Sequence, residues 1–165
     1  MRRYGGLILS LVLCLATGCL YGFSGGGLPP RIRTMAMSTF DNQTPSPDLP
    51  KELYDQLHNG MRRRLGLRDA PSDRADAIVR GVIQSYDADV PVGFSADQRQ
   101  SVTARRRLQI TIEIEIVDQS NGHVLYQNKG LRQEADYDER AEASGRTQAI
   151  EKIVNKVIED VQSNW

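Results

Sequence analysis

Leu108-Gln109-Ile110-Thr111-Ile112-Glu113-Ile114-Glu115-Ile116 is the stretch of sequence that decides the fold. Apolar residues occupy every second position, and each residue between them is polar or charged. Because successive side chains of a β-strand point to opposite faces, this period of two predicts a strand with one buried face and one polar face. The chain is therefore expected to contain a sheet that buries one face.

A hairpin is predicted immediately after this strand. Asn121-Gly122 is a strong hairpin signal because both residue types tolerate the positive φ angles of a tight turn. Residues 123–134 are expected to pair back as an antiparallel strand. Upstream, the apolar residues within 75–89 predict another strand, and the proline, glycine and polar residues of 90–103 predict an exposed loop.

Two amphipathic helices are predicted on either side of these strands. The first is expected to begin at Asp48 as the N-cap and to stop at Gly66, with leucines and a methionine at four-residue spacing between them. The second is expected over residues 138–163, where apolar residues recur at steps of three and four. Gly145 is its weak point, and a start after it leaves Ser144 as the cap.

Residues 31–40 alternate imperfectly and predict a first strand, which completes the order β-α-β-β-β-α. The crossover helix makes the first two strands parallel or nearly so, with right-handed connection. We therefore predict an α+β fold, a two-layer sandwich in which a four-stranded mixed sheet carries two helices on one face. Residues 31–165 are expected to form this single domain.

The N-terminus resembles a bacterial lipoprotein signal. Two arginines and a short apolar run precede Leu15-Ala16-Thr17-Gly18-Cys19, and the apolar run is too short to span a membrane, which takes about 20 residues. Residues 1–18 are read as a cleaved signal peptide, Cys19 as the lipidated residue, and residues 19–30 as a tether rich in glycine and proline. Leu20, which is not aspartate, favours the periplasmic face of the outer membrane.

Composition excludes several classes of protein. After loss of residues 1–18 the chain has two more acidic than basic residues, which argues against nucleic acid as a partner. No cysteine follows Cys19, so neither a disulfide nor a thiolate metal site is expected in the domain. His58 and His123 are the only histidines and cannot together complete a metal site. No cofactor is expected beyond the covalent lipid on Cys19.

Several stretches of the sequence together resemble one family, the outer-membrane lipopolysaccharide-assembly lipoproteins LptE. The resemblance is carried by Tyr21-Gly22-Phe23-Ser24-Gly25, Leu28-Pro29, Phe40-Asp41-Asn42-Gln43-Thr44, Ala75-Asp76-Ala77-Ile78-Val79-Arg80-Gly81, Gly122-His123-Val124-Leu125-Tyr126 and Trp165. Leu20 departs from a glycine and Tyr126 from a tryptophan that the family often has. The resemblance implies a non-enzymatic plug of an LptD-type β-barrel that helps the barrel assemble and assists lipopolysaccharide delivery to the outer leaflet.

Two groups of arginines are candidates for contact with lipopolysaccharide phosphates or with the barrel. The first is Arg105, Arg106 and Arg107, and the second is Arg62 and Arg63 with Arg64. Guanidinium groups bind phosphate bidentately, although such residues also serve simply as solvated surface. Glu113 and Glu115 share one strand face and invite a hydrolase hypothesis, but alternating glutamates are ordinary on a solvated face.

Two alternative functions remain open on the sequence. The first is a lipoprotein adaptor or activator of another envelope complex, such as a peptidoglycan synthase or a secretion channel, on a similar fold. The second is a lipid-anchored hydrolase. The hydrolase is disfavoured because the sequence offers no nucleophile motif and no set of metal ligands.

Overall fold

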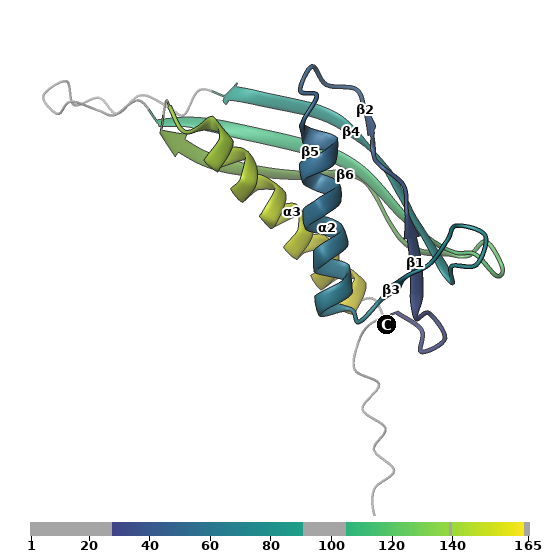
Figure 1. The fold of residues 1–165 in the computed structure, drawn as a ribbon. Coiled ribbons are helices and arrows are strands. Elements are labelled where there is room, and N and C mark those ends of the chain that lie inside the picture. The colour runs from purple at the N-terminus through teal and green to yellow at the C-terminus, as the bar shows by residue number, and fades with distance from the viewer. Residues whose placement is uncertain (1–27, 91–104, 139, 164–165) are drawn as a thin grey trace, which may run out of the picture.

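The computed structural model describes residues 28–90, 105–138 and 140–163, and these form one layer of strands and one layer of helices (Figure 1). The signal peptide, Cys19, Trp165 and residues 91–103 of the predicted loop lie outside the described residues, whereas Val90, predicted to lie in that loop, is the last residue of β4. The elements are β1 (Thr34–Met37), β2 (Asp41–Asn42), α2 (Leu49–Arg64), β3 (Arg68–Asp69), β4 (Ala77–Val90), β5 (Arg105–Asp118), β6 (Val124–Asp138) and α3 (Glu142–Ser163).

The sheet is mixed, as predicted. Its order is β3-β1-β4-β5-β6, with β2 also pairing to β4. β1 runs parallel to β4, whereas β4, β5 and β6 are antiparallel neighbours. The predicted count of four strands is wrong, because the described residues form a sheet of six. The two additional strands, β2 and β3, have two residues each, which is too short for any alternating pattern to reveal.

The predicted first strand, residues 31–40, is shorter in the structure, where β1 covers Thr34–Met37, and a local irregularity separates β1 from β2 at Asp41–Asn42. Met37 pairs with Val79 and Asp41 with Val82, so three residues on this edge oppose two residues of β4. The extra residue lets the Phe40 ring turn into the core, where it is 3% exposed and lies over Gly81. A Cβ atom on Gly81 would lie 2.4 Å from Phe40 Cε1, so this contact requires glycine.

β5 is the centre of the long antiparallel part of the sheet. Its five alternating apolar residues are all buried, as the period of two predicts: Leu108, Ile110, Ile112, Ile114 and Ile116. The pairing shifts register between Ile83 and Ser85 on β4, and between Ile112 and Ile114 against β6. Such bulges increase twist, and the long strands curve over the helices in Figure 1.

α2 begins where the sequence predicts, but Asp48 does not cap it with its side chain. The first turn instead carries Glu52, whose backbone N–H donates to the Asp48 carbonyl at 3.1 Å. The Glu52 carboxylate accepts two hydrogen bonds of 2.8 Å from Arg146 on α3, so the two helices are joined at this end by a bidentate ion pair. Gly66 follows the helix with φ of +69° and reverses the chain direction.

α3 begins at Glu142, later than the predicted residue 138, because β6 continues to Asp138. The alternative start after Gly145 with Ser144 as cap is also not found, since both residues lie inside the first turns. Gly145 is buried against β6, and a Cβ atom there would lie 2.9 Å from Tyr137 Cβ. The glycine therefore permits close approach of helix and strand.

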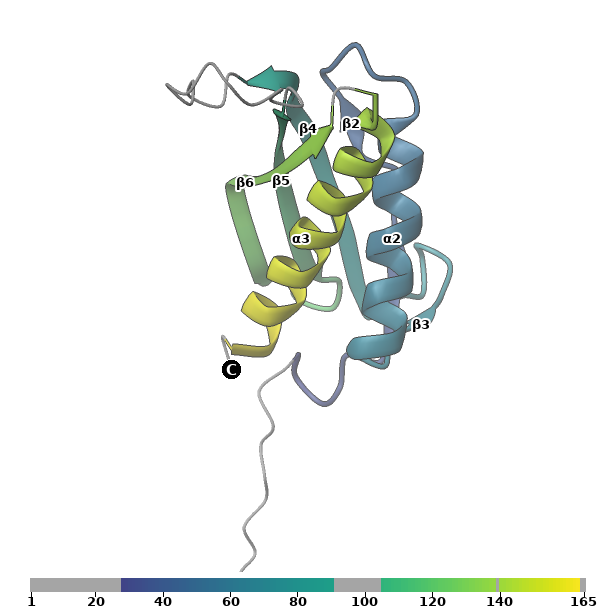
Figure 2. The same ribbon diagram turned by 90° about the vertical axis from the view of Figure 1, so that its left-hand side faces the viewer.

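Both helices cover the same face of the sheet, as predicted (Figures 1 and 2). They pack closely at Gly60, where a Cβ atom would lie 2.7 Å from Val154 Cγ1 of α3. The helices contribute two rows of fully or almost fully buried apolar side chains to the core: Leu49, Leu53, Leu57 and Met61 from α2, and Ala149, Ile150, Ile153, Val154, Val157, Ile158 and Val161 from α3. Within the described residues, neither helix has the length and apolarity that crossing a membrane requires.

Candidate functional site

The carboxylate of Asp76 holds the start of β1. It accepts hydrogen bonds of 2.9 Å from the backbone N–H groups of Arg33 and Thr34, and one of 2.8 Å from the Thr34 hydroxyl. These hydrogen bonds lower the pKa of Asp76 below its usual value, and the bond from the Arg33 N–H contributes most. This residue belongs to the Ala-Asp-Ala stretch singled out in the sequence, and it explains structurally why an acidic residue stands there.

Asn42 organises the loop that leads to α2. Its Oδ1 accepts hydrogen bonds from the backbone N–H of Thr44 at 3.1 Å and from the Thr44 hydroxyl at 2.8 Å, while its Nδ2 donates to the Ser46 carbonyl at 2.8 Å. These bonds form an Asx turn, as expected when an asparagine bonds to its own turn. The Phe-Asp-Asn-Gln-Thr stretch thus combines a core aromatic residue with a self-bonded turn.

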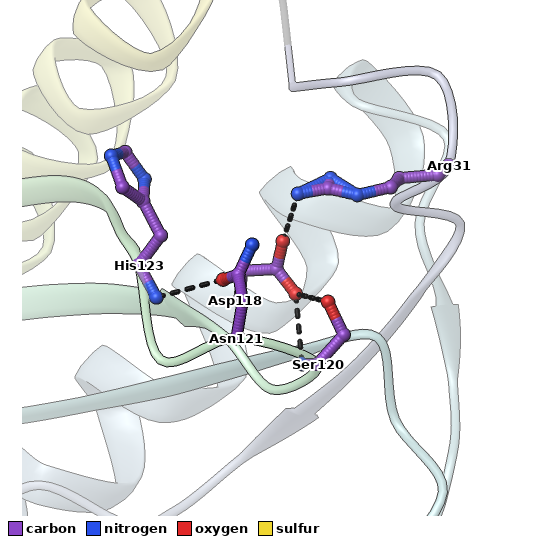
Figure 3. Close-up of polar contacts among 5 residues, drawn as sticks. All are labelled: Arg31, Asp118, Ser120, Asn121 and His123. Atoms are coloured by element: carbon purple, nitrogen blue, oxygen red, sulfur yellow. Dashed lines mark hydrogen bonds and ion pairs between the residues drawn. The ribbon is translucent and has the colours of Figure 1, made fainter.

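The first described segment is joined to the β5–β6 hairpin by an ion pair (Figure 3). The Arg31 guanidinium donates to Asp118 Oδ2, and Asp118 is only 1% exposed. Asp118 Oδ1 accepts hydrogen bonds from the backbone N–H and the hydroxyl of Ser120. The bond from the Ser120 hydroxyl is the main cause that lowers the pKa of Asp118, and the bond from the Ser120 N–H and the charge of Arg31 lower it further. The chain is therefore fixed to the body of the domain at the point where residues 19–30 join it.

The hairpin itself departs from the two-residue turn that Asn121-Gly122 suggests. Asp118 N–H donates to the His123 carbonyl, so residues 119–122 form the loop. Gly122 alone has positive φ, at +71°, and Asn121 Oδ1 accepts from the His123 N–H at 2.9 Å. Arg31 and Asp118 carry no local motif, and the sequence reasoning did not find their pairing because 87 residues separate them.

The outer face of the sheet, opposite the helices, is largely polar. Arg80 on β4 forms a hydrogen bond and ion pair of 2.8 Å with Glu115 on β5. Glu115 is therefore engaged in a cross-strand ion pair. A short apolar row crosses the same face where Ile78 pairs with Val117, and Val117 with Val124, which is 41% exposed.

Two arginines near the start of β5, Arg106 and Arg107, are held by carboxylates of neighbouring strands. Arg106 lies 3.0 Å from Asp89, and Arg107 lies 2.7 Å from Asp136 and 3.5 Å from Glu134. The hydrogen bond to Asp136 raises the pKa of Arg107. The backbone of Arg105 pairs with Asp138. These three residues lie in β5, whereas the sequence placed them just ahead of the strand.

The arginines at the end of α2 lie at the other end of the molecule and form a separate group. Arg62 lies 3.6 Å from Asp69, whereas Arg64 donates to the neutral side chain of Asn155 on α3 at 2.5 Å. Arg62 and Arg63 line an open hollow together with Asn59, Gly66, Leu67, Asp69 and Arg68. Arg68 was not singled out in the sequence, because only the turn at Gly66 brings it back beside the helix.

The two predicted arginine groups therefore do not form one site. Asp69 also lies 2.5 Å from His58, whose ring stacks on Tyr54 with centroids 5.4 Å apart. His58 is thus part of a side-chain cluster that faces β3. Among the residues described by the structure, no three histidine, cysteine, aspartate or glutamate side chains are grouped so that they could hold a metal ion.

Comparison with known proteins identifies the family. The family model described as LptE, lipopolysaccharide-assembly, matches residues 32–164. A comparison with curated protein sequences finds no match.

Solved structures of low sequence identity share the fold. Protein XCC0632 from Xanthomonas campestris has a TM-score of 0.57 at 9% identity, with 83% of this chain and 90% of that chain covered. The hypothetical protein CT253 from Chlamydia trachomatis has a TM-score of 0.54 at 9% identity, with 79% and 95% covered. The PelC dodecamer from Paraburkholderia phytofirmans has a TM-score of 0.50 at 20% identity, with 79% and 91% covered. At these identities the likeness concerns the fold alone.

The family match extends over nearly all the described residues. It includes β1 and the Asp76 carboxylate that binds its start, the Phe40–Gly81 contact and both helices. The chain belongs to the LptE family of lipopolysaccharide-assembly proteins.

Proposed function

We propose that this protein is a lipid-anchored, non-enzymatic component of lipopolysaccharide assembly that plugs an LptD-type β-barrel in the outer membrane. In this role it helps the barrel assemble and assists the delivery of lipopolysaccharide to the outer leaflet. The observation that carries the proposal is the match of the LptE family over residues 32–164. The lipid on Cys19 would fix the protein to the periplasmic face of the outer membrane, since several acyl chains make attachment effectively permanent.

The surface of the domain is compatible with a place inside a barrel. The lumen of a large outer-membrane barrel is polar, so its plug requires a hydrophilic exterior. The face of the sheet opposite the helices carries Arg80 paired with Glu115, and the start of β5 carries Arg107 paired with Asp136. Both pairs are accessible to a partner, and their charges are already balanced within the domain.

Contact with lipopolysaccharide phosphates or with the barrel is proposed for the two arginine groups. Arg105, Arg106 and Arg107 lie at one end of the sheet, and Arg62 and Arg63 lie at the end of α2. A phosphate that binds at Arg106 or Arg107 must compete with the carboxylates of Asp89 and Asp136. A phosphate at the end of α2 meets fewer competing carboxylates, because Asp69 is the one acidic residue among those that line the hollow beside Arg62 and Arg63.

Purification from outer membranes in mild detergent tests this function. An affinity-tagged protein is expected to bring down one large β-barrel at a constant ratio, and mass spectrometry of the mature N-terminus is expected to find acyl chains on Cys19. Recovery of the lipidated protein without any barrel would refute the plug. The matched control is Cys19→Ser, which should lose the lipid and keep the fold, because the core lies within the described residues.

A second candidate is an adaptor that works in another envelope complex. It is favoured by one observation, the shared fold with PelC, which that structure records as a dodecamer. The two candidates differ in assembly state. A ring of many copies, measured by light scattering of the detergent-purified protein, would favour the adaptor, whereas a complex of one copy with one barrel would favour the plug.

A further inference from the structure

One end of the domain carries both the junction with residues 19–27 and a group of arginines. The last turn of α2, the start of β1, β3 and the C-terminal end of α3 all lie at this end, where the described chain begins at Leu28 (Figures 1 and 2). The pairing of Thr34 with Arg68 and the hydrogen bond from Arg68 N–H to the Arg33 carbonyl bring these strands together.

Four exposed arginines gather here, and we call them the tether-end cluster: Arg33, Arg62, Arg63 and Arg68. Gly66 is essential to this arrangement, because its positive φ turns the chain from α2 into β3. Arg33 Nε reaches only the Pro30 carbonyl, at 3.4 Å. Most of the cluster thus keeps its donors available to a ligand.

Few negative charges compensate the cluster. Asp69 is shared between Arg62 and His58, and the Asp76 carboxylate accepts hydrogen bonds from the backbone N–H groups of Arg33 and Thr34. On α3, Asp160 is bound by Lys156 and by the Tyr126 hydroxyl. For Arg63 and Arg68, the described part of the chain provides no carboxylate within ion-pair distance. A domain whose mature chain is slightly acidic thus has one end with excess positive charge.

The lipid anchor limits how far this end can lie from the bilayer. Nine residue-to-residue steps lead from Cys19 to Leu28, and an extended chain spans at most about 3.6 Å per residue, so the reach is roughly 30 Å. Attraction between arginines and an anionic leaflet falls off over a Debye length of about 8 Å at physiological salt. The tether therefore keeps the cluster in a volume where contact with the leaflet is frequent.

We propose that the tether-end cluster binds the anionic phospholipid headgroups of the leaflet that holds the lipid anchor, and so orients the domain on the membrane. The proposal rests on the lipidation of Cys19 in the proposed function. Guanidinium groups suit this ligand because they donate two parallel hydrogen bonds to one phosphate. The paired arginines of β5 lie at the other end and face away from the leaflet in this orientation.

Vesicle co-sedimentation tests the cluster without the lipid. The probe is the whole mature chain with Cys19→Ser, mixed with vesicles of phosphatidylcholine alone or with phosphatidylglycerol added. The double variant R63E/R68E reverses the charge of two arginines of the cluster that have no carboxylate within ion-pair distance in the described part of the chain. The matched control is R132E/R140E, which changes net charge equally at exposed arginines away from this end. Circular dichroism verifies that each variant is folded.

We expect binding to phosphatidylglycerol vesicles that weakens with salt and is absent with phosphatidylcholine alone. R63E/R68E should lower the partition coefficient by at least about 25-fold, from roughly fivefold for each positive charge lost, while R132E/R140E changes it little. Equal loss in both variants would overturn the proposal, because net charge alone would explain binding. Binding to vesicles containing lipopolysaccharide at matched charge, but not to phosphatidylglycerol, would also overturn it and favour direct lipopolysaccharide contact.

The vesicle experiment and the tests of the proposed function can fail separately. Barrel co-purification and the mass of the lipidated Cys19 test the plug and the anchor, and both can succeed when the vesicle experiment fails. If Cys19 carries no lipid, the vesicle result still measures the cluster, but its orienting role is refuted.

Discussion

Gly81→Ala is the substitution that most sharply tests how the edge of the sheet is built. A Cβ atom at this position would lie 2.2 Å from the Glu113 carbonyl oxygen of β5 and 2.4 Å from Phe40 Cε1. Both distances are shorter than any van der Waals contact, so the Phe40 ring and the β4–β5 pairing must both shift. Phe40 and Gly81 belong to two separate stretches of the family resemblance, and their contact in the core gives a physical reason why the two stretches occur together.

The expected size of the effect follows from two opposing contributions. Overpacking a well-packed site costs about 1–3 kcal/mol, and replacing glycine by alanine in the unfolded chain returns about 0.4–1 kcal/mol. Because one of the two clashes involves backbone rather than a flexible side chain, we expect the cost to prevail. The free energy of unfolding should fall by about 1–2 kcal/mol.

Urea unfolding followed by circular dichroism measures this difference. Gly130→Ala is the matched control, because no atom lies within 4 Å of a Cβ atom built there and its φ is not positive. That control should be neutral or slightly stabilising. Adding Phe40→Leu to Gly81→Ala should recover part of the loss, since the smaller side chain relieves one of the two clashes. If the Gly81→Ala variant has the same free energy of unfolding as the Gly130→Ala variant, the reasoning is refuted.

Three further predictions follow from individual contacts. Asp76→Ala should cost about 1 kcal/mol at neutral pH, the usual value for a carboxylate that caps backbone N–H groups. Because the pKa of Asp76 is lowered in the folded state, this difference should be complete well above the ordinary value of 3.8 and should disappear as the pH falls below it, measured by urea unfolding across pH. Arg146→Met should cost about 1 kcal/mol because it leaves Glu52 without its bidentate partner, whereas Lys156→Met, at an exposed pair, should leave the stability almost unchanged in the same assay. Leu57→Ala should cost about 2–5 kcal/mol, because Leu57 is fully buried between the layers, and an unchanged thermal midpoint would contradict its place in the core.

Long periodic segments made the main elements predictable from the sequence. The alternation at 108–116 identified β5, and the apolar steps of three and four identified α3, because each pattern follows directly from strand or helix geometry. The predicted ends of the helices and strands were less accurate. β6 continues to Asp138 because Tyr137 packs against Gly145, a contact between strand and helix that no local pattern contains.

The elements that the sequence missed are those made by tertiary contact. β3 has only Arg68 and Asp69, and it exists because Gly66 turns the chain back alongside β1. The Arg31–Asp118 ion pair joins residues that are remote in sequence, and it also lacks any motif. The arginine groups were found as runs of like residues, but only the structure distinguishes Arg107, which is paired, from Arg63 at the far end.

Depletion of the protein in its own bacterium tests the central proposal most directly, by measuring lipopolysaccharide exposed on the cell surface together with the amount of folded LptD-type barrel. The proposed function predicts that both fall together, while lipopolysaccharide accumulates behind the outer membrane. Surface lipopolysaccharide and folded barrel that stay at their normal levels after the protein is gone would contradict it.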